Sequence, residues 1–447
     1  MHTESLFELP ESEAPPPAPA TRPEQARVYR PVRNQVEWAP RDLDSQLPLD
    51  HPARAIWAML EGLALAAFYA GIKATLGHAG HPTTDPQVLL ALWLYATAEG
   101  VGSARELDRL CEEHDAYRWL RGGVPINYHM LSDFRVAHQE ALDGLLTQIL
   151  GSMMVEGLVT LRHVAQDGMR VRASAGASSF RRKQTLEKCL AEAREQVERL
   201  AQEREHPDPG VNRRQQRARE RAARERCARV KQALKHLPEI EATKERQRRV
   251  QAKDKKGKVT EARASTTDAE ARVMKMPDGG FRPALNVELA TDVDSKVIVG
   301  VDVINVGSDG GQALPMAEEV IARTGRSPEA YLTDGGLVKR EDITALEQKA
   351  ITVYAPTTSP RTETSGRTKA MARPDDTPEV ATWRARMETP EAKVIYKERG
   401  ATAELANARA RALGVQQFTV RGVTKVLSVM LMVAITHNLQ RWIALVA

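Results

Sequence analysis

The stretch Ile395–Arg411 (IYKERGATAELANARAR) carries polar side chains at helical spacing. On a helix of 3.6 residues per turn, five of them fall within an arc of roughly 140°: Tyr396, Arg399, Glu404, Asn407 and Arg411. The periodicity predicts that the opposite, apolar face packs on a core: Ala401, Leu405, Ala408 and Ala412. The polar arc is then either a solvated face or a carboxylate flanked by a phenol and two guanidinium groups, which needs partners elsewhere in the chain.

Two aspartates offer such partners. Asp167 lies in the segment 163–173 (HVAQDGMRVRA), and Asp334 ends the segment 330–334 (AYLTD). Each follows a short apolar run and precedes a glycine, so we expect each to close a strand, as a turn residue or as a ligand. Two strand-end aspartates followed by Glu404 on a helix could converge on two divalent cations, for which carboxylate oxygens are suitable ligands.

These residues, in this chain order, resemble the site of bacterial insertion-sequence transposases. That family has an Asp-Asp-Glu site on a ribonuclease-H-like fold, and the resemblance is closest to the insertion sequence eleven-eighty-two family. It covers about residues 37–447, and its most specific element is Tyr, two residues, Arg, then Glu and six residues to a basic residue, matched by Tyr396, Arg399, Glu404 and Arg411. Further family-like phrases lie at 164–173, 265–276 (STTDAEARVMKM), 332–334 and 436–442 (THNLQRW).

Two positions depart from the family pattern. Arg411 stands where lysine is commoner, and Asn407 stands where a large apolar or aromatic residue is usual. Both departures concern residues of the helix that we expect to position DNA, and neither concerns a carboxylate.

The resemblance implies metal-dependent cleavage and strand transfer at the ends of an insertion sequence. Asp167, Asp334 and Glu404 would be catalytic and would hold two Mg²⁺ (or Mn²⁺) ions, whereas Tyr396, Arg399 and Arg411 would bind DNA. The implied partners are double-stranded DNA, as terminal inverted repeats and target, and further copies of the chain in a homodimer or higher oligomer. Two other functions stay open: a catalytically silent, transposase-derived DNA-binding protein, and a metal nuclease without strand transfer.

Composition predicts a cytoplasmic protein with more than one core. The chain has 447 residues, of which 42% are hydrophobic, and its three cysteines are far apart without a CxxC pair, which favours neither disulfides nor zinc. Residues 1–40 hold 8 of the 25 prolines and no signal peptide, which predicts a disordered tail. The longest apolar run, at 426–435, is about half a membrane span, so we expect a buried helix and no membrane segment.

Periodicity and the resemblance together divide the chain into domains. We expect an all-helical N-terminal domain at 41–150 that binds DNA ends or merely docks, and an α/β ribonuclease-H-like catalytic domain at 151–179 and 263–447. Alternating apolar residues at 285–289 and 297–303 predict a strand hairpin beside the Asp167 strand. Four other aspartates lie in turns or point out of a strand, which predicts structural roles: Asp292, Asp294, Asp302 and Asp309.

The remaining segment, 180–262, interrupts the catalytic domain and is strongly basic. Apolar residues step by three and four along 186–200 and again along 223–237, on either side of HPDPG at 206–210, which predicts a coiled-coil-like helical hairpin. The segment holds 25 Lys and Arg against 14 Asp and Glu, a net charge of +11, whereas the rest of the chain is net −6. This local excess favours binding to DNA phosphates, although a solvated face or an oligomer contact has the same pattern.

Overall fold

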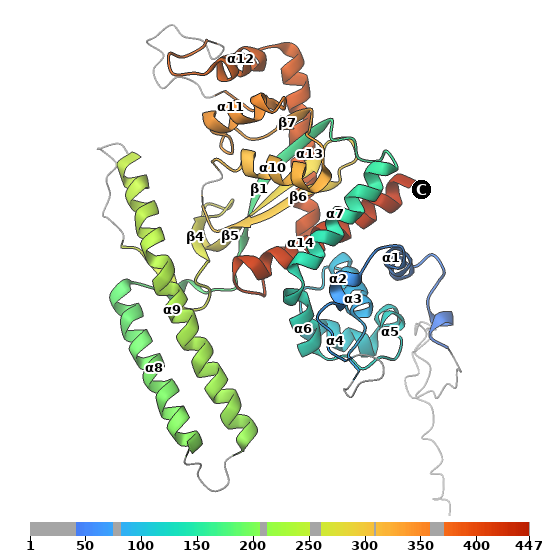
Figure 1. The fold of residues 1–447 in the computed structure, drawn as a ribbon, viewed down its shortest axis with the longest axis vertical. Coiled ribbons are helices and arrows are strands. Elements are labelled where there is room, and N and C mark those ends of the chain that lie inside the picture. Colours follow the sequence, from blue (N-terminus) through green and yellow to red (C-terminus); the bar gives the residue numbers. More distant parts are fainter. Residues whose placement is uncertain are drawn as a thin grey trace, which may run out of the picture. The chain divides into compact units, whose positions relative to one another are not determined.

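The computed structural model describes residues 42–74, 82–205, 212–250, 261–307, 310–357 and 371–446 (Figure 1). The tail expected at 1–40, the turn expected at 206–210 and Asp309 lie outside these residues.

Seven helices form the N-terminal part of the described chain: α1 (Pro52–Glu61), α2 (Ala66–Tyr69), α3 (Pro86–Ala98), α4 (Ala104–Glu113), α5 (Asp115–Arg121), α6 (Tyr128–Ala137) and α7 (Gln139–Val155). α3 is buried along almost its whole length, because it is surrounded by α1, α5, α6 and the C-terminal helix α14 (Val423–Val446). The helical N-terminal region expected from the sequence is therefore present, and it shares one continuous hydrophobic core with the C-terminal part of the chain.

A mixed sheet forms the centre of the C-terminal part. Its strands are β1 (His163–Arg172), β4 (Arg272–Lys275), β5 (Phe281–Asp292), β6 (Ile298–Ile304), β7 (Ala330–Leu332) and β8 (Thr352–Tyr354). The order is β4-β5-β1-β7-β8, and β6 pairs with β5 on the side away from β1. β1, β5 and β6 are antiparallel, which confirms the predicted hairpin, while β7 and β8 run parallel to β1.

Helices cover both faces of this sheet. α10 (Ala313–Thr324) lies directly on one face, since a Cβ added to Gly300 of β6 would lie 2.6 Å from the sulfur of Met316. α13 (Pro390–Ala412) lies on the other face and contacts β1 and β5. Two further helices, α11 (Arg340–Gln348) and α12 (Pro378–Met387), come after β7 and before α13 in the sequence. They pack on each other.

α14 is the central helix of the core. It packs against β6, α3, α6 and α7, and the amide of Asn438 exchanges two hydrogen bonds with the backbone of Ile298, N–H to Oδ1 at 2.9 Å and Nδ2 to O at 2.8 Å. Asn438 thus satisfies backbone groups on the free edge of β6, where no neighbouring strand could. α14 is also long and apolar enough to cross a membrane, but 56% of its most apolar window is buried, as expected for a core helix.

The basic insertion folds into two long helices. α8 (Lys183–Glu205) and α9 (Arg213–Val250) pack along each other, and α9 contains Pro238. The predicted stepping is confirmed in part, because Leu190, Val197 and Leu234 are half-buried and Ala233 is buried instead of Leu234. The fully buried side chains on this face are Leu186, Ala193, Leu200, Ala223, Cys227, Val230, Ala233 and Leu237. At their base, a small cluster joins them to β3 (Ala264–Ser265), which pairs with β2 (Phe180–Arg181) in a separate two-stranded sheet.

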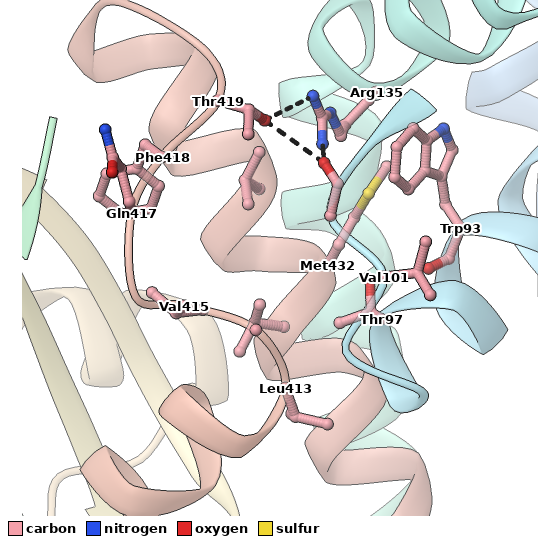
Figure 2. A pocket seen from close by; sticks show the side chains of 14 residues that line it. Trp93, Thr97, Val101, Arg135, Leu413, Val415, Gln417, Phe418, Thr419 and Met432 are labelled. Carbon is pink, nitrogen blue, oxygen red and sulfur yellow. Dashed lines mark hydrogen bonds between the residues drawn. The ribbon is translucent and has the colours of Figure 1, made fainter. Parts of the chain in front are cut away.

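A small cavity of about 50 Å³ lies where α3 and α6 meet the chain that follows α13 (Figure 2). Arg135 of α6 is 6% exposed there; it donates hydrogen bonds to the Gly102 carbonyl at 2.6 Å and to the Thr419 hydroxyl at 3.1 Å. Its guanidinium also lies over the Trp93 ring, and burial lowers its pKa to about 10. Arg135 therefore links the N-terminal helices to the segment that follows α13 in the chain.

The same junction depends on two glycines in the left-handed region. Gly100 has φ +73° and Gly414 has φ +91°, and a Cβ added to Gly414 would lie 2.8 Å from the Gly100 carbonyl oxygen. Real Cβ atoms are essentially never found that close to a backbone oxygen, so the chain after α13 approaches the chain after α3 this closely because Gly414 has no Cβ.

We expect Gly414→Ala to destabilise the fold by on the order of 3 kcal/mol, because it adds a backbone clash to the strain of positive φ. The matched control is Gly123→Ala: Gly123 also has positive φ (+77°), but an added Cβ meets nothing within 4 Å. That variant should cost about 1 kcal/mol. Urea unfolding of both variants measures the difference, and equal losses of stability would show that the approach at Gly414 tolerates a side chain.

Candidate active site

Asp167 lies in the middle of β1, so the prediction that it closes a strand is wrong. β1 continues to Arg172, and its pairing with β5 runs without interruption, with Asp167 opposite Leu289 and Gly168 opposite Glu288. Gly168 serves packing within the sheet: a Cβ there would lie 2.7 Å from a carboxylate oxygen of buried Glu288. An Asp-Gly pair can therefore mark a crowded strand as well as a turn.

Asp334 lies just beyond the end of β7, as expected, and the strand register places it beside Asp167. In the parallel β1–β7 pair, Ala165 is opposite Leu332. Asp167 comes two residues after Ala165, and Asp334 comes two residues after Leu332. The chain stays extended at Thr333, whose N–H donates to the Tyr354 carbonyl at 3.0 Å. Since side chains alternate along strands, continuing this register by two residues brings both aspartates to the same end of the pair, and both carboxylates act on Tyr396.

α13 packs with the opposite face from the one predicted. The apolar side chains expected in the core are exposed: Ala401, Leu405, Ala408 and Ala412. The buried face instead combines small residues with polar ones: Ala392, Thr402, Ala403, Ala406, Asn407 and Ala410. The prediction was wrong because it assumed that the apolar face is the buried one, whereas the sheet offers polar partners to the other face and small alanines let the helix come close to them.

Asp167 provides the central contact between α13 and the sheet. Arg399 Nη2 donates to Asp167 Oδ1 at 3.1 Å, and Asn407 Nδ2 donates to Asp167 Oδ2 at 2.9 Å. The Arg399 side chain is 16% exposed and that of Asp167 27% exposed, so this ion pair is largely shielded from water.

Two further polar contacts fix α13 along its length. His163 Nδ1 and Glu398 Oε2 are 2.8 Å apart, and Lys296 Nζ donates to the Thr402 hydroxyl at 2.7 Å. Together with the Asp167 contacts, they tie successive turns of the helix to β1 and to the β5–β6 turn. The helix position is thus set by polar side chains at several points, which fixes both its rotation and its height on the sheet.

Tyr396 lies half-buried beside both aspartates. Burial raises the pKa of its phenol, and the nearby Asp334 and Asp167 carboxylates raise it further, while the Arg399 guanidinium opposes them. A phenol is protonated at neutral pH, and the upward shift in pKa strengthens that state, so the Tyr396 hydroxyl can donate a hydrogen bond. Tyr396, Arg399, Asp167 and Asp334 therefore form one cluster.

Glu404 and Arg411 lie outside this cluster, on the exposed side of α13. Glu404 is three residues before Asn407, so helix geometry places it about 60° around the helix from the residue that contacts Asp167. No hydrogen bond or ion pair engages its carboxylate within the described residues. In that part of the chain, no three His, Cys, Asp or Glu side chains are grouped to hold a metal ion.

Sequence reasoning missed several residues that position the site. Asn407 was predicted to lie on the polar arc but was given no role, although it contacts Asp167 directly. His163, Glu398 and Lys296 carry no recognisable signal in the sequence. Two family-like phrases have supporting roles: Asn438 of 436–442 completes β6, and Glu270 of 265–276 accepts a hydrogen bond from Val423 N–H at 2.8 Å at the start of α14.

Asp292 and Asp294 have the structural roles that were predicted. Asp292 accepts hydrogen bonds from the N–H groups of Leu161 and Ser295, and Asp294 forms an ion pair with Arg162 at 2.8 Å. Both carboxylates therefore hold the β5–β6 turn against the start of β1, away from the Asp167 cluster.

Comparison with known proteins gives two family matches. Residues 41–137, which comprise α1 to α6, match a family described as "Transposase domain (DUF772)". Residues 359–443, which include α12, α13 and most of α14, match a family described as "Transposase DDE domain". No curated protein and no solved structure matches the chain. One match precedes the strands of the sheet in the sequence and the other follows them. Together they support an insertion-sequence DDE transposase.

Proposed function

We propose that this protein catalyses metal-dependent cleavage and strand transfer of DNA at insertion-sequence ends. The observation that supports the proposal is that Asp167 and Asp334, which follow paired residues of β1 and β7, both act on Tyr396 of α13, while Arg399 of the same helix pairs with Asp167. These four residues come from three elements far apart in sequence. In a chain with two transposase matches, such convergence of carboxylates with DNA-binding groups favours a catalytic site over a structural one.

The sheet supports a ribonuclease-H-like catalytic domain. Three antiparallel strands, β6, β5 and β1, are followed by the parallel strands β7 and β8, and the first aspartate lies on the central strand. The second follows the adjacent parallel strand, and the glutamate is on a later helix that packs on the same face. This chain order and this topology support the proposal of a ribonuclease-H-like domain.

The oxygen donors of the cluster fit a divalent cation. Asp167 and Asp334 present two adjacent carboxylates, and the buried side-chain oxygen of Asn407 beside them has no hydrogen-bond partner among the described residues. Hard oxygen ligands of this kind suit Mg²⁺ or Mn²⁺. We assign Asp167, Asp334 and Glu404 as the residues that would hold two such ions, which when bound supply Lewis-acid stabilisation for displacement at phosphorus. Glu404, which is exposed about 60° around α13 from Asn407, would have to turn toward the two aspartates to do so.

The neighbouring side chains would bind and orient the DNA strand. The protonated phenol of Tyr396 can donate to a phosphate oxygen, and the guanidinium groups of Arg399 and Arg411 can pair with phosphates through two hydrogen bonds each. Arg411 is exposed one turn beyond Asn407, so it would meet the DNA farther from the reacting phosphate. These roles are positional, since none of the three side chains needs to form a covalent bond.

The helical insertion would supply a second surface for DNA. Many of its arginines are already paired within the insertion, for example Arg226 with Glu192 and Arg229 with Glu225. Four exposed arginines at the start of α9 line one open hollow and have no carboxylate partner among the described residues: Arg213, Arg214, Arg217 and Arg221. We assign these four to DNA phosphates, because cations without a carboxylate partner give up no ion pair when they bind a phosphate.

The remaining assignments complete the proposal. The N-terminal helices would bind transposon-end DNA, and the protein would act in the cytoplasm as a homodimer or higher oligomer on DNA. A catalytically silent DNA-binding protein or a nuclease without strand transfer would share this fold. An assay with end DNA and target DNA separates all three.

We expect Asp167→Ala, Asp334→Ala and Glu404→Ala each to abolish DNA cleavage while leaving end binding nearly unchanged, because the carboxylates would hold cations rather than DNA. Cleavage of labelled end DNA in Mg²⁺ and in Mn²⁺, with gel-shift binding in parallel, measures both properties. Glu391→Ala is the matched control, since Glu391 is an exposed glutamate on the same helix. Any variant that retains cleavage removes its residue from the site.

We expect Tyr396→Phe and Arg399→Ala to slow strand transfer by about tenfold or more, because each removes a hydrogen bond to a charged group. Single-turnover strand transfer measures the change in rate, and thermal unfolding shows whether the fold persists. A variant that no longer unfolds cooperatively would place its residue among the structural contacts of α13.

Replacing Arg213, Arg214, Arg217 and Arg221 with glutamine should weaken DNA binding and flatten its salt dependence, by about 0.9 in log–log slope for each phosphate that the variant no longer neutralises. The control replaces the same number of carboxylate-paired arginines of this insertion: Arg199, Arg224, Arg226 and Arg229. The control should change the slope less, because those charges are already neutralised. An unchanged slope together with a smaller assembly by light scattering would instead make the insertion an oligomer contact.

A further inference from the structure

The guanidinium of Arg399 lies beside Asp167, where a divalent metal ion would also bind. Its guanidinium lies 3.1 Å from Asp167 Oδ1 and pairs directly with that carboxylate. Two carboxylates at one level of neighbouring strands repel each other, so the cluster needs positive charge nearby. In the protein without metal, Arg399 supplies part of that charge from within the chain.

Arg399 and Asn407, which both contact Asp167, differ in how they respond to a metal ion. Asn407 is neutral and contacts Oδ2, so it can stay in place and orient the carboxylate. Arg399 is a cation, and a divalent ion at Oδ1 would lie within a few ångströms of it. Repulsion between a full charge and a divalent cation at such a distance is large in a site shielded from water.

Arg399 also has a hydrogen-bond donor that its contacts within the described residues leave unused. The Nε of its guanidinium is buried without a hydrogen-bond partner among the described residues, and its ion pair with Asp167 is made through Nη2 alone. The side chain lies next to Tyr396 at the margin of the α13 interface, with 16% of it reaching solvent. A phosphate near Tyr396 would offer the Arg399 guanidinium two acceptor oxygens, whereas Asp167 now offers it one.

We infer that Arg399 is an internal counter-ion that competes with the divalent cation for Asp167 and is released to a DNA phosphate. This inference rests on the proposed function. Metal binding and DNA binding are then coupled through one side chain: DNA that draws Arg399 away from Asp167 tightens metal binding, and metal at Asp167 frees Arg399 for DNA. The free protein holds its metal weakly, which limits cleavage away from a bound end.

Titration of the full-length protein with Mn²⁺, followed by electron paramagnetic resonance of the free ion, tests the competition without any assay of activity. Arg399→Gln should bind Mn²⁺ on the order of fivefold more tightly than the wild type, because a partly shielded ion pair no longer opposes the metal. Arg409→Gln is the matched control, since it removes an exposed arginine of the same helix and should leave the Mn²⁺ affinity unchanged. The Mn²⁺ binding that is lost in Asp167→Asn is the binding at this site.

The possible outcomes separate the inference from the proposed function. If Arg399→Gln binds Mn²⁺ no more tightly than the wild type while Asp167→Asn still abolishes binding at the site, the counter-ion role is wrong and the metal assignment stands. If Asp167→Asn leaves Mn²⁺ binding unchanged, Asp167 holds no metal and both fail. Arg399→Met, which keeps the length of the side chain, replaces Arg399→Gln if the latter does not fold.

Adding a short duplex of arbitrary sequence tests the coupling, with Mn²⁺ bound by DNA alone subtracted. The duplex should tighten Mn²⁺ binding by the wild type and by Arg409→Gln, but much less by Arg399→Gln, because that variant has no guanidinium to release. Equal tightening in all three proteins would show that DNA acts on the metal through its overall charge, and the coupling through Arg399 would be refuted.

Discussion

The contact between Asp167 and α13 is the interaction on which the rest of the site depends. A carboxylate in the middle of a central strand is costly unless charge and hydrogen bonds compensate it, and here Arg399 and Asn407 do so from one helix. Because both side chains reach the same carboxylate, they fix how α13 is rotated on the sheet. That rotation in turn decides which residues of the helix lie near Asp334 and which face solvent.

The packing of α13 allows these polar contacts to form. Ala403, Ala406 and Ala410 are buried against the sheet, and their small side chains bring the helix backbone close enough for Asn407 to reach Asp167. Larger side chains at those positions would hold the helix farther away. The helix is also tied down at its C-terminal end, where Gly414 meets Gly100 and Arg135 links α6 to Thr419. The site is therefore positioned from both the sheet and the N-terminal helices.

Charge is distributed unevenly over the molecule in a way that suits this arrangement. The α8–α9 insertion carries a large positive excess, while the remainder of the chain is net negative. Ion pairs engage many arginines of the insertion, whereas four arginines at the start of α9 line one hollow without a carboxylate partner among the described residues. Long-range attraction of DNA and local chemistry at the carboxylates are thus assigned to different elements.

The sequence by itself determined the elements and the order of the residues that could do chemistry. Local periodicity, which can be read from a short window of sequence, predicted three features. These are the strand hairpin, the helical N-terminal region and the stepping of apolar residues in the insertion. The chain order of Asp167, Asp334 and Glu404, with Tyr396 and Arg399, also pointed to a DDE transposase, which the family matches support.

Only the tertiary structure decided which faces of those elements meet. That Asp167 lies within a strand follows from its long pairing with β5, because Asp-Gly is compatible with both a turn and a crowded strand. That Asn407 and Arg399 of α13 turn toward the sheet, while Glu404 and Arg411 stay exposed, follows from the partners that β1 presents to the helix. A helical pattern contains no information about those partners. The neighbourhood of Asp167 and Asp334 likewise depends on the β1–β7 register, which sets residues far apart in sequence at one level.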